Sequence, residues 1–182
     1  MNALFVHLNG PACIGKSTLA QRLVALTPLA LCLDVDAIRA SLGGWTEAPE
    51  SKQLARDIAA DMAARHLALG YDVVMPQLTV LESQIDLLAA IARDAGASFV
   101  ELVLVADPDE LVARLPGADP GAPHPRDAFT SGELRDQMQY AIDALLPLAA
   151  TRPDAHVLDV GGMPPDAAFA SVRAVIDSSR RA

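Results

Sequence analysis

The sequence predicts an α/β protein in which helices cover both faces of a five-stranded, mostly parallel sheet. Short apolar runs alternate with stretches of helical periodicity, as expected for successive βα units. A glycine-rich turn joins the first apolar run directly to the first helical stretch. The length of 182 residues suits one compact domain, so we expect residues 1–182 to form a single three-layer α/β/α unit.

The first half of the chain holds three expected strands and three expected helices. The strands are short apolar runs at 3–8, 29–33 and 73–75. The helices lie at 16–26, at 49–69 and in a short stretch through 38–42. Prolines and glycines mark the ends of these elements, namely Pro28, Gly43, Gly44, Gly70 and Pro76. In the longest helix one face is apolar and should be buried, formed by Leu54, Ile58, Met62 and Leu69.

The second half continues the alternation, with strands expected at 99–105 and 157–160. The helices between and after them are expected at 82–95, 107–115, 133–146 and 166–178. Asp107, Pro108 and Glu110 form a good helix start, with a capping carboxylate, a proline in the first turn and an acid three residues on. Residues 116–127 carry four prolines and two glycines, so we expect a lid at about 115–128.

Composition narrows the classes of partner. A net charge of −9 would repel a long polyanion, which argues against nucleic acid. No apolar run is long enough to cross a membrane, and the first residues show no basic signal-peptide region. We therefore expect a cytoplasmic protein, monomeric or homodimeric, with no membrane contact. Only Cys13 and Cys32 are cysteines, so no disulfide framework is expected.

One motif carries the functional argument. Residues 10–17 read Gly-Pro-Ala-Cys-Ile-Gly-Lys-Ser and fit the Walker A pattern G-x-x-x-x-G-K-S/T. Its glycines let successive backbone N–H groups surround phosphate oxygens, and the following helix adds the positive end of its dipole. Lys16 can reach the β- and γ-phosphates, and the Ser17 hydroxyl can bind Mg²⁺. The residues expected to bind the nucleotide are Gly10, Pro11, Ala12, Cys13, Ile14, Gly15, Lys16, Ser17 and Thr18.

The stretch from Asn9 to Thr18 resembles the opening of the small P-loop kinases, within the P-loop NTPase superfamily. This group includes chloramphenicol phosphotransferase, zeta-toxin, gluconate kinase, shikimate kinase and polynucleotide kinase. The resemblance implies a P-loop NTPase fold with a lid, ATP and Mg²⁺ as cofactors, and transfer of the γ-phosphoryl group to a hydroxyl.

A second group of residues follows the second strand. Asp36 stands three residues before Arg39, the spacing found at this point in related kinases. The resemblance implies that Asp36 accepts the proton of the acceptor hydroxyl and that Arg39 holds the acceptor or a phosphate. Asp36 could instead cap the short helix, and Arg39 could be a surface cation. Asp34 is expected on the same side, either binding magnesium through water or simply solvated.

The third strand departs from the family pattern, because Pro76 and Gln77 stand where many P-loop enzymes carry a magnesium-binding acid. Asp34 and Asp36 therefore become the stronger candidates for the carboxylates beside the magnesium ion. Gln77 is a candidate for contact with the acceptor, since ligands bind at the carboxyl ends of strands in such sheets.

Family position also implies a role for three arginines. Arg114 and Arg126 would reach the phosphates from the lid, where a planar guanidinium can donate two hydrogen bonds at once. Arg152, before the fifth strand, would pack on the adenine.

The sequence therefore predicts an ATP-dependent small-molecule kinase, with catalytic residues Asp36, Lys16 and Arg126. The acceptor would be a sugar, nucleoside, antibiotic or related metabolite. Two alternatives stay open. One is a nucleotide-binding regulatory protein without phosphoryl transfer, and the other is a kinase of nucleic-acid 5′-hydroxyl groups.

Overall fold

The computed structural model describes residues 2–115 and 129–181. Its strands are β1 (Leu4–Asn9), β2 (Leu31–Cys32), β3 (Val73–Pro76), β4 (Ser98–Val105) and β5 (Ala155–Asp159). Its helices are α1 (Lys16–Ala25), α2 (Val35–Ala40), α3 (Ser51–Ala68), α4 (Glu82–Asp94), α5 (Pro108–Ala113), α6 (Ser131–Ala150) and α7 (Pro165–Ser179). The expected lid at about 115–128 lies, apart from Leu115, outside the described residues.

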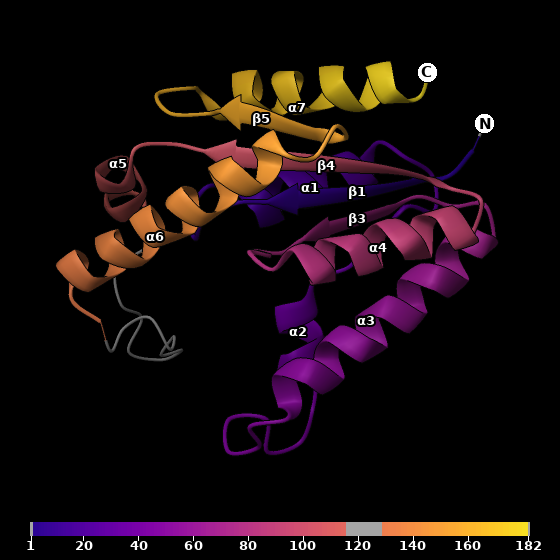
Figure 1. Cartoon of the computed structure of the whole chain (residues 1–182), viewed down its shortest axis with the longest axis horizontal. Helices are drawn as coiled ribbons and strands as arrows, with labels where there is room; N and C mark the ends of the chain where they lie inside the picture. The colour runs from indigo at the N-terminus through magenta and orange to yellow at the C-terminus, as the bar shows by residue number, and fades with distance from the viewer. Residues whose placement is uncertain (1, 116–128, 182) are drawn as a thin grey trace.

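The five strands form one sheet in the order β2-β3-β1-β4-β5, and each described pair is parallel. The α/β fold class with helices on both faces is therefore confirmed (Figure 1). Because every strand runs the same way, all carboxyl ends meet at one edge. Loops leaving that edge after β1, β2, β3 and β4 can share a site.

Alternate residues of the central strand β1 face opposite helical layers. Leu4, Val6 and Leu8 pack under α1 and α7, within one buried cluster. Phe5 faces the other layer, where α3 and α4 cover the sheet, and its ring meets Phe99 edge-on at 5.7 Å between centroids. No helix in the described part of the chain has the length and apolar character that crossing a bilayer requires.

Helix α3 buries a different face from the one predicted. Leu54, Met62 and Leu69 are exposed by 47%, 41% and 53%. The buried face is instead a stripe with four-residue spacing, made of Ser51, Ala55, Ala59, Ala63 and Leu67. Small side chains allow the helix axis to approach the sheet closely, and this close approach outweighs the burial of the larger apolar side chains.

Several boundaries differ from the predicted ones for local reasons. Leu29 has a φ of +60°, so β2 starts only at Leu31. Strand β3 includes Pro76 as its last residue, one position beyond the expected end. The Gln77 N–H then donates a further hydrogen bond to the Leu8 carbonyl of β1 at 3.1 Å. Helix α6 continues past Pro147 to Ala150, because its last turns pack on β4.

The alanine stripe predicts a marked sensitivity to side-chain volume. Ala59→Leu should lower the free energy of unfolding by about 1–3 kcal/mol, because the fully buried position has no space for three more carbon atoms. Ala68→Leu, at an exposed position of the same helix, is the matched control and should change stability by less than about 0.5 kcal/mol. Urea unfolding of both variants would measure the difference, and equal stabilities would contradict the packing described.

Candidate functional site

The loop between β1 and α1 contains three residues with positive φ values. Gly10 has a φ of 146°, and a Cβ there would lie 2.6 Å from the Leu104 carbonyl oxygen, so only glycine fits. Gly15, with a φ of 95°, and Cys13, with a φ of 60°, add two more left-handed positions. Positive φ values at these positions allow the loop N–H groups to turn toward a bound anion, and α1 begins directly after Gly15, which suits phosphate binding.

Lys16 and Ser17 begin helix α1 at the mouth of this loop. The Lys16 Nζ donates hydrogen bonds to the carbonyl oxygens of Gly10, at 2.8 Å, and Pro11, at 2.6 Å, so the ammonium group lies across the loop. The side chains of Ser17 and Thr18 are in the first turn and exposed. The loop thus has one ammonium and one hydroxyl group beside it at the start of α1.

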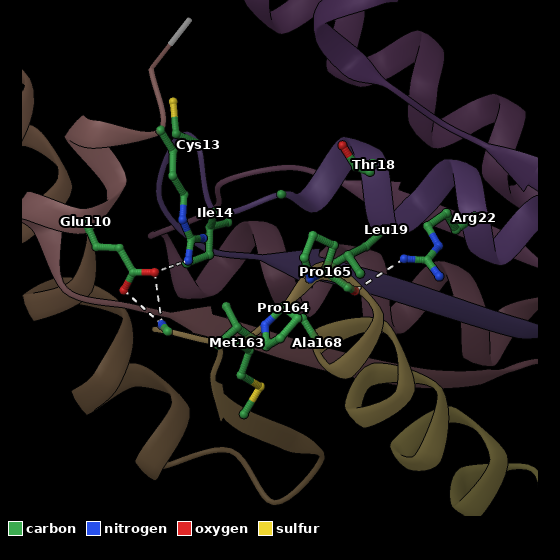
Figure 2. Close-up of a pocket in the computed structure, with 14 residues that line it drawn as sticks. Cys13, Ile14, Thr18, Leu19, Arg22, Glu110, Met163, Pro164, Pro165 and Ala168 are labelled. Carbon is green, nitrogen blue, oxygen red and sulfur yellow. Dashed lines mark hydrogen bonds and ion pairs between the residues drawn. The ribbon is translucent and has the colours of Figure 1, made fainter.

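A cavity of about 580 Å³ opens on one side of the loop (Figure 2). The loop and α1 form one wall, and α5 with the turn between β5 and α7 forms the other. Much of the lining is apolar, with Ile14, Leu19, Met163 and Ala168 among its residues. Sequence reasoning did not assign this wall, although the Gly161-Gly162 turn after β5 marks where it begins.

Glu110 joins the two parts of the second wall, α5 and the turn between β5 and α7. Its carboxylate accepts the Gly162 N–H at 2.9 and 3.0 Å and forms an ion pair with Arg114 (Figure 2). The Gly162 hydrogen bond, followed by that of Arg114, holds the pKa of Glu110 below its usual range. Glu110 therefore stays ionised and positions the Arg114 guanidinium at the border between this cavity and the next.

A second cavity, of about 530 Å³, lies on the other side of the loop. It brings together most of the side chains that the sequence singled out, namely Lys16, Ser17, Asp34, Asp36, Gln77 and Arg114. They come from α1, from α2 and the turn before it, from the end of β3, and from the residue after α5. The carboxyl edge of the parallel sheet thus collects cationic, hydroxyl and carboxylate groups around one space.

The structure separates the roles of the two aspartates. Asp34, not Asp36, is the N-cap of α2: its Oδ1 accepts the N–H groups of Asp36, at 3.0 Å, and Ala37, at 3.1 Å. Within residues 2–115 and 129–181, the Asp36 carboxylate takes part in no hydrogen bond or ion pair. Asp36 is exposed and faces the cavity, so its oxygens are available to a ligand.

Arg39 lies further along the same wall. Its Nε donates to the Ser51 Oγ at 2.9 Å, and its guanidinium lies 4.8 Å from the centre of the Trp45 ring. It lines a smaller cavity with Asp36 and Gln77, next to the one at the loop. Arg126, the predicted lid residue, falls outside the described residues.

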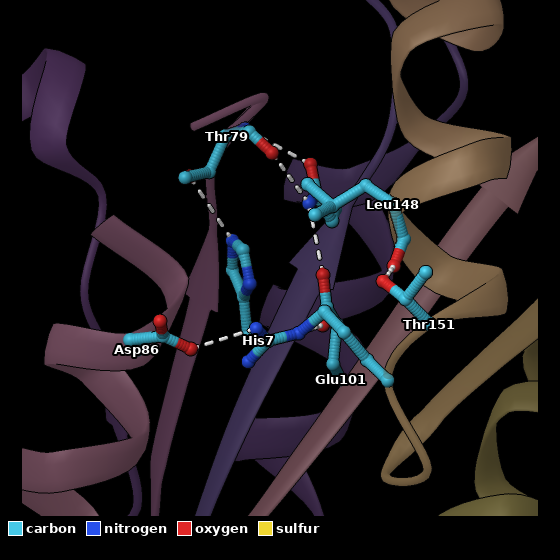
Figure 3. Close-up of polar contacts among 8 residues, drawn as sticks. His7, Thr79, Asp86, Glu101, Leu148 and Thr151 are labelled. Atoms are coloured by element: carbon cyan, nitrogen blue, oxygen red, sulfur yellow. Dashed lines mark hydrogen bonds and ion pairs between the residues drawn. The ribbon is translucent and has the colours of Figure 1, made fainter. Parts of the chain in front are cut away.

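Arg152 is not beside the nucleotide loop, contrary to the family-based expectation. Its guanidinium pairs with Glu101 at 3.1 Å and with Asp86 at 2.7 Å (Figure 3). Arg152 is not among the residues that line the two cavities at the loop. The reason is strand direction. Arg152 precedes β5 and so lies toward the amino ends of the parallel strands, whereas the loop follows the carboxyl end of β1.

A buried network of hydrogen bonds, which the sequence did not predict, holds the first residues of the loop. The Asn9 side chain accepts the N–H groups of Gly10 and Thr79, both at 2.9 Å. It donates to the Thr79 carbonyl at 2.9 Å and to Glu101 at 3.2 Å (Figure 3). Asn9 is fully buried and Glu101 is 1% exposed, so these bonds replace water completely and fix the start of the loop to β4 and to the segment that follows β3.

The family assignment rests on a sequence match over most of the chain. A family model described as an AAA domain matches residues 5–118, which is more than half of the chain. The chain belongs to this AAA domain family. No curated protein sequence matches it.

Solved structures extend the likeness of this AAA domain family member to nearly the whole chain. The Deinococcus radiodurans tunicamycin resistance protein superimposes with a TM-score of 0.62 at 15% identity, covering 96% of this chain and 95% of that one. For a gluconokinase from Sinorhizobium meliloti 1021 the TM-score is 0.61 at 18% identity, with coverages of 99% and 93%. For thymidylate kinase from Candida albicans it is 0.66 at 14% identity, with coverages of 98% and 93%. At such identities the likeness is one of fold, and the fold is that of the small P-loop kinases.

The buried histidine under the site predicts a pH dependence of stability. The Nε2 of His7 lies 3.0 Å from the Gln77 carbonyl oxygen, and its Nδ1 has no hydrogen-bond partner within the described residues. Burial, with smaller contributions from the charges of Lys16 and Arg152, lowers the pKa of His7 to about 4, although the bond to Gln77 opposes this shift. His7 is therefore neutral in the folded protein near pH 7.

As pH falls from 6.5 to 4, the unfolded chain gains a proton on His7 that the folded chain does not, so stability is lost in this window. The loss attributable to His7 should reach about 3 kcal/mol, from the difference between the two pKa values. His7→Gln, whose amide nitrogen reaches about as far as Nε2 and cannot titrate, should lose correspondingly less. Urea unfolding across this pH range measures both, and parallel curves would refute the assignment.

Proposed function

We propose that the protein transfers the γ-phosphoryl group of ATP to a hydroxyl group of a small molecule. The observation that carries the proposal is the Asp36 carboxylate, which shares one cavity with Lys16 and Ser17 of the phosphate-binding loop. A proton acceptor beside a triphosphate site is what transfer to a hydroxyl requires.

The nucleotide would lie along the loop. Its phosphates would meet the inward N–H groups and the Lys16 ammonium, which would exchange its carbonyl partners for β- and γ-phosphate oxygens. Its base would enter the largely apolar cavity of about 580 Å³, whose size and lining suit an aromatic ring system. Arg114, at the border of the two cavities, would reach the phosphates.

The groups around the loop are compatible with magnesium. Within the described residues no cluster of three or more His, Cys, Asp or Glu side chains could hold a metal ion. However, the Ser17 hydroxyl and the carboxylates of Asp34 and Asp36 line one cavity, and Mg²⁺ accepts few protein oxygens, completing its shell with water and substrate phosphates. Bound there, Mg²⁺ would offset negative charge on the transferred group.

The chemistry follows from these positions. The acceptor oxygen forms a bond to the γ-phosphorus while the bond from that phosphorus to the β,γ-bridging oxygen breaks, and ADP leaves. The hydroxyl proton passes to Asp36. Lys16 and Arg114 stabilise the charge on the equatorial oxygens, a task that we also assign to Arg126 of the lid. The acceptor class at this level is a sugar, nucleoside, antibiotic or related metabolite, and the expected setting is the cytoplasm.

Replacing the ammonium group tests the nucleotide site. Lys16→Ala should weaken binding of Mg²⁺–ATP by roughly tenfold or more, equivalent to about 1.4 kcal/mol, because it removes the charge closest to the phosphates. Isothermal titration calorimetry measures this loss. Arg65→Ala removes an exposed cation from α3 and should leave the affinity unchanged. If Lys16→Ala bound as tightly as the parent, the loop would not be the triphosphate site.

Replacing the proposed proton acceptor tests the chemistry. Asp36→Asn should lower kcat about 10²- to 10⁴-fold, since the amide keeps the shape but cannot take the proton. The dissociation constant for ATP should stay within about twofold of the parent value. The assay uses any compound from a panel of hydroxyl-bearing metabolites that yields a phosphorylated product, and Asp61→Asn, at an exposed position on α3, is the control. Unchanged turnover in Asp36→Asn would exclude Asp36 as the base.

A further inference from the structure

We infer that the phosphoryl acceptor carries a negatively charged group, a carboxylate or a phosphate monoester, which binds beside Asp36 against Arg39, Lys52 and Arg56. This inference rests on the proposed function and adds the charge of its substrate. It excludes neutral sugars, nucleosides and neutral antibiotics as the best acceptors.

The group would occupy a cavity of about 140 Å³ between α2, α3 and the end of β3. Its lining residues are Val35, Asp36, Arg39, Lys52, Arg56 and Gln77. Asp36 and Gln77 also line the cavity at the loop, so the two spaces adjoin at the proposed proton acceptor. A small molecule can therefore present a hydroxyl to Asp36 while another of its groups lies among the three cations.

The charges in this cavity are unbalanced, unlike those around most of the described arginines. Seven of the described arginines form ion pairs with Asp or Glu side chains. Arg39, Lys52 and Arg56 form none with any described residue, although the chain as a whole has a net charge of −9. Three cations facing a single carboxylate repel one another, and an anion placed among them removes that repulsion.

Arg39 is held in position before any ligand arrives. Its Nε donates to the Ser51 Oγ at 2.9 Å, and that hydroxyl donates to the Trp45 carbonyl at 2.8 Å. Ser51 is 3% exposed, and the Trp45 ring supports the guanidinium at 4.8 Å. A fixed planar guanidinium suits a carboxylate or a phosphate, because either anion can accept two parallel hydrogen bonds from it.

Lys52 and Arg56 are one helical turn apart on α3, so their side chains share the face that borders this cavity. Gln77 supplies an uncharged contact: its Oε1 is buried and has no hydrogen-bond partner within the described residues. Adjacent to these residues, a further space of about 70 Å³ is lined largely by aliphatic groups and accommodates only a small apolar extension.

The acceptor's charge can be measured without turnover. Trp45 is the only tryptophan of the chain and lies against Arg39, so its fluorescence reports directly on anion binding there. With the loop saturated by Mg²⁺–ADP, inorganic phosphate and acetate should change the Trp45 emission in a saturable manner at low ionic strength. The double variant Lys52→Gln/Arg56→Gln should lose this response at least tenfold in affinity, while Arg65→Gln should keep it.

Turnover then tests the substrate itself. Matched pairs such as glycerol 3-phosphate with glycerol, and gluconate with glucose, belong to a wider panel of anionic and neutral hydroxyl compounds. Acceptors should be found among the anions, and the double variant should raise their KM about ten- to hundredfold with the ATP dissociation constant unchanged.

The possible results separate the two proposals. The anionic acceptor would be overturned if neutral compounds were phosphorylated as well as anionic ones, or if the double variant had the same KM as the parent. Either result would leave the kinase proposal standing. A phosphate response in the fluorescence assay that depends on Lys52 and Arg56, with no phosphorylated product from any compound, would overturn phosphoryl transfer while supporting the anion site. Absence of any fluorescence response would refute the anion site outright.

Discussion

The side chain of Asn9 is the constraint on which the site depends. Four hydrogen bonds hold it, to the Gly10 N–H, to both backbone groups of Thr79 and to Glu101. Glu101 is buried and requires the charge of Arg152, which in turn bonds Asp86 on α4. A buried polar group left without its partner costs about 1–3 kcal/mol, so the network holds together only as a whole. Through it the glycine loop, the end of β3 and α4 keep one relative arrangement.

The distribution of charge around this frame favours small anions over long ones, in line with the proposed acceptor. The surface is acidic overall, yet cations gather at the carboxyl edge of the sheet in two groups. Lys16 and Arg114 flank the loop, and three further cations lie behind Asp36. A long polyanion would meet the acidic surface around these sites, whereas a small anion that enters the cavities meets mainly positive charge.

Sequence was sufficient for features that local chemistry determines. The alternation of apolar runs and helical stretches predicted the sheet, and the Walker A spacing predicted the loop. It failed where distant residues decide. The buried face of α3 follows from close packing on the sheet, not from where its leucines lie. The contact between Asn9 and Glu101 spans 92 positions and has no local signal. Arg152 lies apart from both cavities at the loop because it precedes the parallel strand β5. The four-residue spacing of Lys52 and Arg56 is visible in the sequence. That the two cations face Asp36 and Arg39 follows only from the position of α2 beside α3.

The division of labour between walls has a consequence for how such proteins diversify. In the proposed function ATP binds at the loop that follows β1, whose first residue is fixed by the buried network of Asn9 and Glu101. The proposed acceptor contacts on α3, Lys52 and Arg56, are exposed or half-buried and lie beside the buried stripe of small residues that packs on the sheet, not within it. If the proposed function holds, substitution of these two residues can therefore change the acceptor without changing the nucleotide site or the fold.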